Sequence, residues 1–112
     1  MSGQQQPFFS IVIPTLNEEK YLPKLLQNLA DQTFKDFEVI HVDGRSEDKT
    51  VQKAARFSKK LDIKTLISQK RHVSHQRNLG GKKAQGKWLV FMDADNFLKP
   101  YFLQGLKYFC CI

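Results

Sequence analysis

Cysteine is scarce in this 112-residue sequence, whose two cysteines are the neighbours Cys110 and Cys111. Adjacent cysteines rarely bond to each other, and no histidine stands at zinc-ligand spacing from them. The polar start of the chain also lacks the charged and then apolar layout of a secretory signal. We therefore expect a cytoplasmic protein with reduced thiols.

Long apolar runs and glycine-rich phosphate loops are missing as well. No stretch approaches the ~18 apolar residues that cross a bilayer, and neither a dinucleotide-binding fingerprint nor a Walker A loop is present. Hydrophobic residues nevertheless make up 41% of the chain, which is enough for a globular core. The sequence thus predicts one domain, or a part of one, that follows a flexible N-terminal tail over residues 1–7.

Short apolar runs alternate with segments of helical periodicity. This order predicts an α/β fold, with a Rossmann-like parallel sheet, right-handed crossovers and helices on both faces. The predicted strands are residues 8–13 (ended by Pro14), 37–42, 63–67 and 88–92. The predicted helices cover residues 22–30, a segment capped by Ser46 or Asp48, residues 73–85, and a segment from about Pro100.

The strand ends place three polar loops together. Parallel strands finish on one edge of a sheet, and ligands of open α/β sheets bind there. The loops Pro14–Glu18, Asp43–Ser46 and Asp93–Asp95 each follow a predicted strand. We therefore expect them to converge into one site.

The most informative of these loops is Asp93-Ala94-Asp95, which follows the apolar run that begins at Trp88. Two carboxylates one residue apart suit Mg²⁺ or Mn²⁺, above all when a substrate diphosphate supplies further oxygens. The alternative is a pair of solvated loop aspartates without a ligand.

The two other loops carry weaker signals. The stiff turn that begins at Pro14 exposes backbone groups that could grip a flat base, although Asn17 is also a plausible helix cap. Asp43, at a strand end, could accept a hydrogen bond from a uracil N–H or a ribose hydroxyl. The alternative for this segment is a turn followed by a helix cap.

The predicted helix over residues 73–85 contains several notable side chains. Arg77 could pair with a phosphate or reach a base edge. Gly80 and Gly81 are costly inside a helix, so they indicate close packing, a nearby ligand or an early helix break. We interpret His72 and His75 as surface histidines, because no carboxylate stands at a suitable spacing for a metal site.

Positive charge is concentrated in one segment. The net charge of the chain is +7, and residues 56–87 hold ten Lys or Arg residues and a single acid, Asp62. Such a segment could meet a phosphate-bearing ligand or an anionic membrane surface, or it could be a solvated face. Aromatic residues are not interleaved with it, so nucleic acid is not an expected partner.

Four motifs together resemble family 2 glycosyltransferases with the GT-A fold. Their order and spacing match the family, and they span most of the chain. The motifs are Ser10–Glu19, Val42–Thr50, Gln76–Gly80 and Gly86–Asp95.

The resemblance implies that residues 8–112 form the donor-binding portion of a GT-A domain, which takes a UDP- or GDP-sugar with Mn²⁺ or Mg²⁺. It assigns the metal to Asp95 and Asp93, and it assigns the base to the Pro14 loop and Asp43. Leu16 stands where the family often has an aromatic residue. The implied nucleotide-sugar site consists of Pro14, Thr15, Leu16, Asn17, Glu18, Asp43, Arg77, Asp93, Ala94 and Asp95.

The resemblance also implies an inverting transfer, for which the family uses an Asp or Glu as general base. No candidate for this base follows Asp95, so we expect a donor half that a C-terminal half or an oligomer complements. The acceptor is not readable from the sequence.

Three alternatives stay open at this stage. In the first, the chain is a non-catalytic fragment that binds nucleotide-sugar. In the second, it is a basic module that binds polyanions or membrane surfaces at the cytoplasmic face. An Asp-x-Asp after a strand also occurs in haloacid-dehalogenase-type phosphatases, but Phe97 stands where that family usually has Thr or Val.

Overall fold

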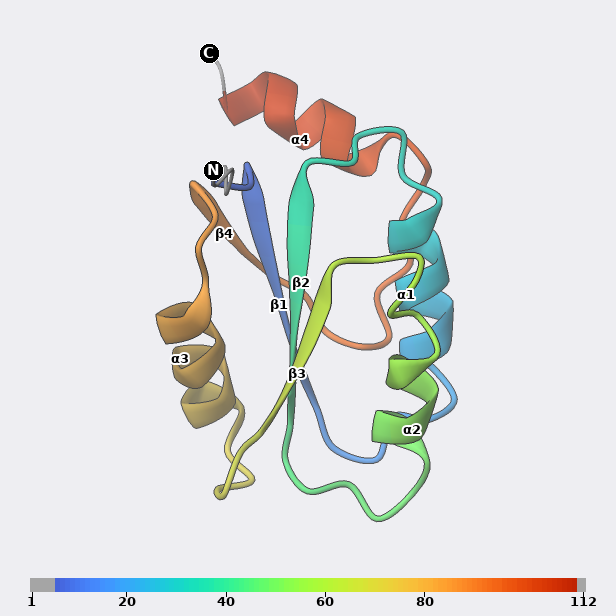
Figure 1. Cartoon of the computed structure of the whole chain (residues 1–112), viewed down its shortest axis with the longest axis vertical. Helices are drawn as coiled ribbons and strands as arrows, with labels where there is room; N and C mark the ends of the chain where they lie inside the picture. The colour runs from blue at the N-terminus through green and yellow to red at the C-terminus, as the bar shows by residue number, and fades with distance from the viewer. Residues whose placement is uncertain (1–5, 111–112) are drawn as a thin grey trace.

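The computed structural model describes residues 6–110, in which strands and helices alternate (Figure 1). The strands are β1 (Phe9–Thr15), β2 (Phe37–Asp43), β3 (Ile63–Ile67) and β4 (Trp88–Phe91). The helices are α1 (Leu22–Ala30), α2 (Thr50–Ala55), α3 (Val73–Lys83) and α4 (Phe102–Cys110). The predicted alternation of strands and helices is confirmed.

The four strands form one parallel sheet in the order β3-β2-β1-β4. In the β1–β2 register, Thr15 lies beside Asp43, so both strands finish at the same level. β4 lies on the side of β1 opposite to β2. It pairs with residues 9–12 of β1 only, and the chain then leaves the sheet. The predicted parallel α/β sheet is therefore confirmed, and its carboxyl edge collects the three loops.

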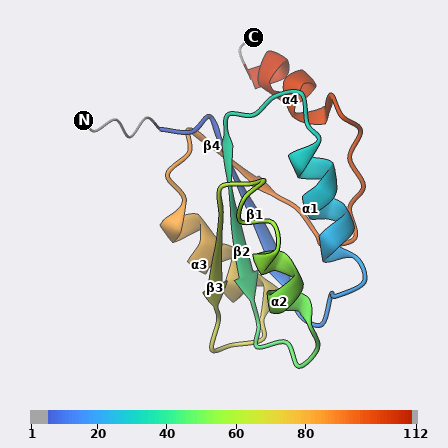
Figure 2. The same ribbon diagram turned by 45° about the vertical axis from the view of Figure 1, so that its right-hand side comes forward.

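Helices cover both faces of the sheet, with α1 and α2 on one face and α3 on the other (Figures 1 and 2). β1 is buried from both sides, because alternate side chains enter opposite layers. Ile11 and Ile13 join the larger core under α1, whereas Val12 joins the smaller core under α3. This two-sided burial explains why β1 is a continuous apolar run.

α3 lies close to the sheet because Gly80 has no side chain. A Cβ atom at Gly80 would overlap with Val12 and crowd Val42, whereas one at Gly81 would make only ordinary contact. Close packing is therefore the reason for the first glycine, and the helix continues past both. α3 ends at Lys83 instead of at residue 85.

Pro14 lies inside β1 and does not end it, which corrects the predicted boundary. The amide of Met92 donates to the carbonyl of Val12, so this side of β1 faces β4. Pro14, two residues further along, also faces that side but lies beyond the last β1–β4 pair. The missing N–H of proline therefore breaks no ladder hydrogen bond.

α4 crosses the amino ends of the strands and buries Leu103 in the larger core (Figure 1). Gln32, which follows α1, ties this segment down, because its Oε1 accepts from the Leu103 amide and its Nε2 donates to the Lys99 carbonyl. Several large apolar side chains stay exposed here and on β4, among them Trp88, Phe91, Tyr108 and Phe109. Among residues 6–110, no helix has the length and apolar character that crossing a membrane requires.

The predicted flexible tail, residues 1–7, falls mostly outside the described residues. Within the described part, the Pro7 carbonyl accepts a hydrogen bond from the Lys87 amide. The cysteine prediction is likewise covered in part: Cys110 is a free thiol, and Cys111 lies outside the described residues.

The basic residues of the segment 56–87 are divided between the two faces of the sheet. Lys59 and Lys60 follow α2 on one face, whereas Lys82 and Lys83 end α3 on the other (Figure 1). The segment therefore does not form a single flat patch.

Candidate functional site

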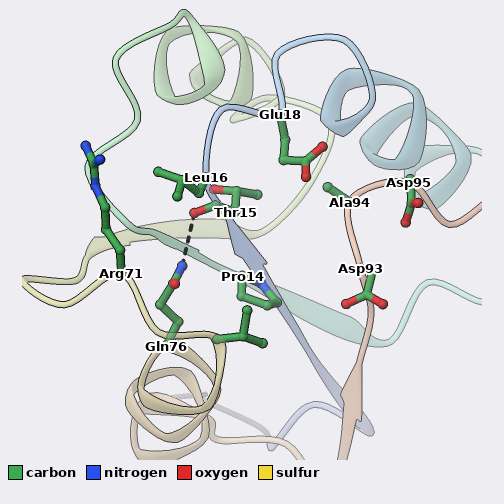
Figure 3. Close-up of a pocket in the computed structure, with 10 residues that line it drawn as sticks. Pro14, Thr15, Leu16, Glu18, Arg71, Gln76, Asp93, Ala94 and Asp95 are labelled. Carbon is green, nitrogen blue, oxygen red and sulfur yellow. Dashed lines mark hydrogen bonds between the residues drawn. The ribbon is translucent and has the colours of Figure 1, made fainter.

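A cleft of about 340 Å³ lies at the carboxyl edge of the sheet (Figure 3). The end of β1 and its loop form one wall, the start of α3 forms the floor, and the loop after β4 forms the opposite wall. Seven of the ten predicted site residues line it, and three others join them. The lining residues are Pro14, Thr15, Leu16, Glu18, Arg71, Val73, Gln76, Asp93, Ala94 and Asp95.

Hydrogen bonds join the loops after β1 and β2 into one unit. Asn17 donates its backbone N–H to Ser46 Oγ at 2.8 Å, and its side-chain oxygen accepts from the Glu47 amide at 2.9 Å. The Glu18 amide donates to Thr50 Oγ1 at the start of α2. The predicted convergence of these loops is therefore confirmed.

Asn17 does not cap a helix, which corrects the alternative considered for it. α1 begins after Tyr21, and Asn17 has a φ of 55°. Asparagine tolerates this left-handed conformation better than most residues. The N-cap residue of α2 is Lys49, so neither predicted cap residue holds that position. Asp48 lies just before it and accepts from the Thr50 amide, whereas Ser46 turns to Asp43. Asn17 thus connects two loops, and it is absent from the cleft lining.

Asp43 lies beneath the cleft rather than in it, because its side chain is 1% exposed. One oxygen accepts from the hydroxyls of Thr15 (2.7 Å) and Ser46 (2.6 Å), and the other accepts from the Ser46 amide (2.7 Å). The carboxylate is thus engaged by the protein itself. The direct contact with a base that the sequence predicts for Asp43 stays a prediction.

His41 extends this buried network on β2. The Thr15 hydroxyl donates to Asp43, so it accepts from His41 Nε2 at 2.7 Å, and Nδ1 lies 3.1 Å from Thr65 Oγ1. Nε2 therefore carries a proton, and the lowered pKa of the ring keeps Nδ1 unprotonated near neutral pH. Burial lowers the pKa of His41 to about 4, against a smaller opposing effect of Asp43.

Three residues of the cleft lining, Arg71, Val73 and Gln76, were missed by the sequence interpretation as site residues. Gln76 forms the floor and is 2% exposed. Arg71 is held by the carbonyls of Gly44 (3.0 Å) and Arg45 (2.8 Å). The sequence does hold a signal for Gln76, because it stands one helical turn before Gly80 and so shares its face of the helix. The structure shows that Gln76 and Gly80 are the two buried residues of α3. A polar side chain on the sheet-facing side of a helix needs a polar partner.

The opposite wall of the cleft carries negative charge. The carboxylates of Asp93 and Asp95 belong to this wall, and the carboxylate of Glu18 extends toward them from the loop after β1 (Figure 3). Partial burial raises the pKa of Glu18, and the charges of Asp95, Asp48 and Asp93 raise it further. Like charges are therefore close enough to repel one another, as expected where a cation is to be held.

These carboxylates fit a divalent cation that shares its shell with a substrate. No three His, Cys, Asp or Glu side chains within residues 6–110 are grouped closely enough to hold a metal by themselves. Mg²⁺ characteristically uses one or two carboxylates together with substrate phosphate oxygens and water. Asp93 and Asp95 would supply the hard oxygen ligands for that arrangement.

Arg77 reaches the site from outside the cleft. Its guanidinium lies 3.4 Å from Asp93 Oδ1, and its side chain lines a neighbouring hollow with Leu89 and Phe91. Its Nε is buried and has no hydrogen-bond partner among the described residues. His72 and His75 are exposed, as predicted for surface histidines.

The comparison of the sequence with family models decides the family. The model for glycosyl transferase family 2 matches residues 10–109. The chain belongs to glycosyl transferase family 2. The resemblance drawn from the four motifs is therefore confirmed.

Curated relatives agree with this assignment. The poly(ribitol-phosphate) beta-N-acetylglucosaminyltransferase TarS of Staphylococcus aureus is 35% identical over 105 residues, which is 90% of this chain and 18% of TarS. A PGL/p-HBAD biosynthesis glycosyltransferase of Mycobacterium bovis is 42% identical over 94 residues, 82% of this chain and 37% of that protein. The chain thus spans well under half the length of these relatives.

Solved structures confirm the GT-A-like fold. Staphylococcus aureus TarS 1–349 in complex with UDP-GlcNAc superposes with a TM-score of 0.89 at 33% identity, over 93% of this chain and 31% of that one. A mannosyltransferase from Pyrobaculum calidifontis in complex with GDP-Man and Mn²⁺ gives 0.76 at 26% identity, over 83% and 29%.

Proposed function

We propose that this chain binds the nucleotide-diphospho-sugar donor of a family 2 glycosyltransferase, together with Mn²⁺ or Mg²⁺, for inverting transfer of the sugar. The observation that carries the proposal is the shared cleft, where Asp93 and Asp95 face the loop that begins at Pro14 (Figure 3). The complexes of TarS with UDP-GlcNAc and of the mannosyltransferase with GDP-Man and Mn²⁺ support it.

The two walls of the cleft would hold different parts of the donor. Pro14, Thr15 and Leu16 form a mainly apolar wall on which a flat base can lie. Asp93 and Asp95 lie opposite and would hold the cation beside the diphosphate. When bound, this cation neutralises the charge that develops on the diphosphate as the sugar–phosphate bond breaks.

Arg77 has a positioning role in this proposal. Its guanidinium lies within ion-pair distance of Asp93, whose side chain is 62% exposed, so it can restrict where the carboxylate points. Asn96 contributes as well, because its Oδ1 accepts from the Asp93 amide at 2.8 Å. We place the acceptor side, and the base that takes the acceptor's proton, outside residues 6–110.

Calorimetry with UDP, GDP and UDP-sugars, with and without Mn²⁺, tests the proposal. We expect binding that depends on the cation, and a loss of at least about tenfold in affinity with Asp95→Asn, because a charged metal ligand disappears. Asp62→Asn is the matched control, since Asp62 is exposed before β3 and away from the cleft.

Two outcomes would contradict parts of the proposal. Absence of metal-dependent binding to any of these nucleotides would remove the donor site itself. Binding that ignores nucleotides but weakens steeply with salt would favour the alternative of a polyanion surface. Sugar transfer to added acceptors separates a transferase from a protein that only binds the donor.

A further inference from the structure

A second hollow, of about 320 Å³, lies between the start of α1 and the turns that end α2, on the face of the sheet away from α3 (Figures 1 and 2). It shares no lining residue with the cleft at the carboxyl edge. The described residues that line it include three cationic side chains and no Asp or Glu. The lining residues are Pro23, Lys53, Arg56, Phe57 and Lys60.

Four of these residues belong to one helical face. Arg56, Phe57 and Lys60 stand three, four and seven positions after Lys53. Helical hydrogen bonds continue past the end of α2, because the Phe57 amide donates to the Ala54 carbonyl (3.0 Å) and the Lys60 amide to the Phe57 carbonyl (3.0 Å). Side chains at this spacing lie on the same side of a helix, so the local backbone gathers the three cations.

This gathering of like charges is only partly relieved by the protein. Like charges three or four positions apart on a helix destabilise it. Lys53 Nζ lies 3.4 Å from a Glu19 carboxylate oxygen, whereas Lys60 Nζ has the neutral Oε1 of Gln27 at 3.3 Å. None of the ion pairs within residues 6–110 uses Arg56 or Lys60. Two of the three positive charges are therefore left for an anion.

The rest of the hollow is apolar. Phe57 packs against the larger core, Pro23 belongs to α1, and the Lys60 ammonium lies 5.7 Å from the centroid of the Phe57 ring. An apolar floor keeps water from one side of an ion pair and so strengthens the pair. A phosphate monoester suits this arrangement, because it carries nearly two negative charges at neutral pH and its oxygens match a guanidinium in bidentate fashion.

We propose that the hollow binds a phosphate monoester, with Arg56 and Lys60 on the phosphate and with Phe57 and Pro23 against the carbon body of the ester. The site is separate from the proposed donor site, and neither depends on the other. A soluble phosphate ester and a phosphatidic acid headgroup share this chemistry, so the experiment includes one arm for each source.

NMR titration of the unaltered chain with phenyl phosphate, without nucleotide or metal, tests the inference. We expect backbone amide shifts centred on residues 53–60 and an affinity that falls as salt is added. Phenol, which lacks the charge, should bind at least about tenfold more weakly. Inorganic phosphate should also bind more weakly, because it leaves the apolar floor uncovered. Shifts centred on Asp93, or equal binding of phenol, would overturn the inference, and equal binding of inorganic phosphate would overturn the role of Phe57 and Pro23.

A pair of variants separates the hollow from general electrostatics. Arg56→Gln should lower the affinity for phenyl phosphate at least about fivefold, because a charge-assisted contact disappears. Lys59→Gln is the matched control, since Lys59 is exposed, carries the same charge and does not line the hollow. Equal losses in the two variants would overturn the inference.

Vesicles identify the source of the phosphate. Binding to phosphatidic acid vesicles over phosphatidylcholine vesicles, weakened by Arg56→Gln but not by Lys59→Gln, would support the site and identify a lipid. Binding of phenyl phosphate without this preference among vesicles would support the site and identify a soluble ester.

Discussion

The two walls of the cleft are built in opposite ways. On the β1–β2 side, hydroxyls, amides and an imidazole engage Asp43 and its neighbours, and hydrogen bonds from backbone amides to side-chain oxygens join the loops. On the β4 side, Asp93 and Asp95 are exposed. The Asp93 backbone exchanges two hydrogen bonds with Asn96, and the Asp93 carboxylate forms an ion pair with Arg77.

One wall is thus already held in place by its own hydrogen bonds, whereas the negative charges of the other wall are not yet neutralised. A satisfied polar network holds its groups in one arrangement and resists rearrangement. A wall of exposed carboxylates stays repulsive until a cation is bound. The first wall should therefore matter most to folding, and the second most to binding. Three experiments address this contrast.

The largest expected effect is on stability. Asp43→Ala removes the acceptor of three hydrogen bonds and should lower the free energy of unfolding by about 3 kcal/mol, since donors at least partly buried lose their partner. Asp93→Ala, an exposed change on the other wall, should cost less than about 0.5 kcal/mol. Urea denaturation of both variants measures the difference. Equal losses of unfolding free energy in the two variants would contradict the difference between the walls.

The pH dependence of stability tests the same network. Unfolded His41 takes up a proton near its ordinary pKa of 6.5, whereas folded His41 resists until about 4. The unfolded state therefore binds more protons in this window, and stability should fall by up to about 3 kcal/mol as the pH falls through it. We expect His41→Asn to flatten this part of the curve. An unchanged slope would contradict the neutral imidazole.

The smallest expected change is in the pKa of Glu18, whose carboxylate faces the charged wall. Burial and neighbouring carboxylates raise its pKa, so a bound cation should lower it again. Side-chain NMR titration with and without Mg²⁺ measures this shift. The Asp95→Asn variant is the control, because it lacks a proposed metal ligand and Mg²⁺ should shift the Glu18 pKa less in it than in the unaltered chain. A Glu18 pKa indifferent to Mg²⁺ would place the cation elsewhere.

The sequence-based interpretation succeeded where local pattern and topology suffice. The strands that begin at Phe9, Phe37 and Trp88 are readable because hydrophobic runs of that length have few other uses. The third run, however, is a largely exposed edge strand and not a buried one. Their parallel arrangement follows from the alternation with helices, and the meeting of the loops follows from parallel strands. The order of four motifs then identified the family.

The interpretation fell short where a side chain's role depends on what lies opposite it. Asparagine is a common helix-cap residue, but Asn17 forms hydrogen bonds with the loop after β2 instead. Asp43 looks available in the sequence, yet Thr15 and Ser46 occupy it. Pro14 seemed to end a strand, because nothing local shows that β4 leaves β1 before that level.

The amino-acid sequence by itself determined the fold class, the family and the edge of the sheet at which the site lies, since all three follow from hydrophobic periodicity and from the order of the motifs. Only the tertiary structure decided which polar groups face the cleft. Gln76 and Asp43 are both polar residues near strand ends, but Gln76 lines the cleft, whereas Asp43 lies beneath it and is satisfied internally. Ser46, three residues from Asp43, is a local partner. Thr15 lies 28 residues from Asp43 and 61 from Gln76, and Val42 lies 34 residues from Gln76, and no local pattern encodes such distances.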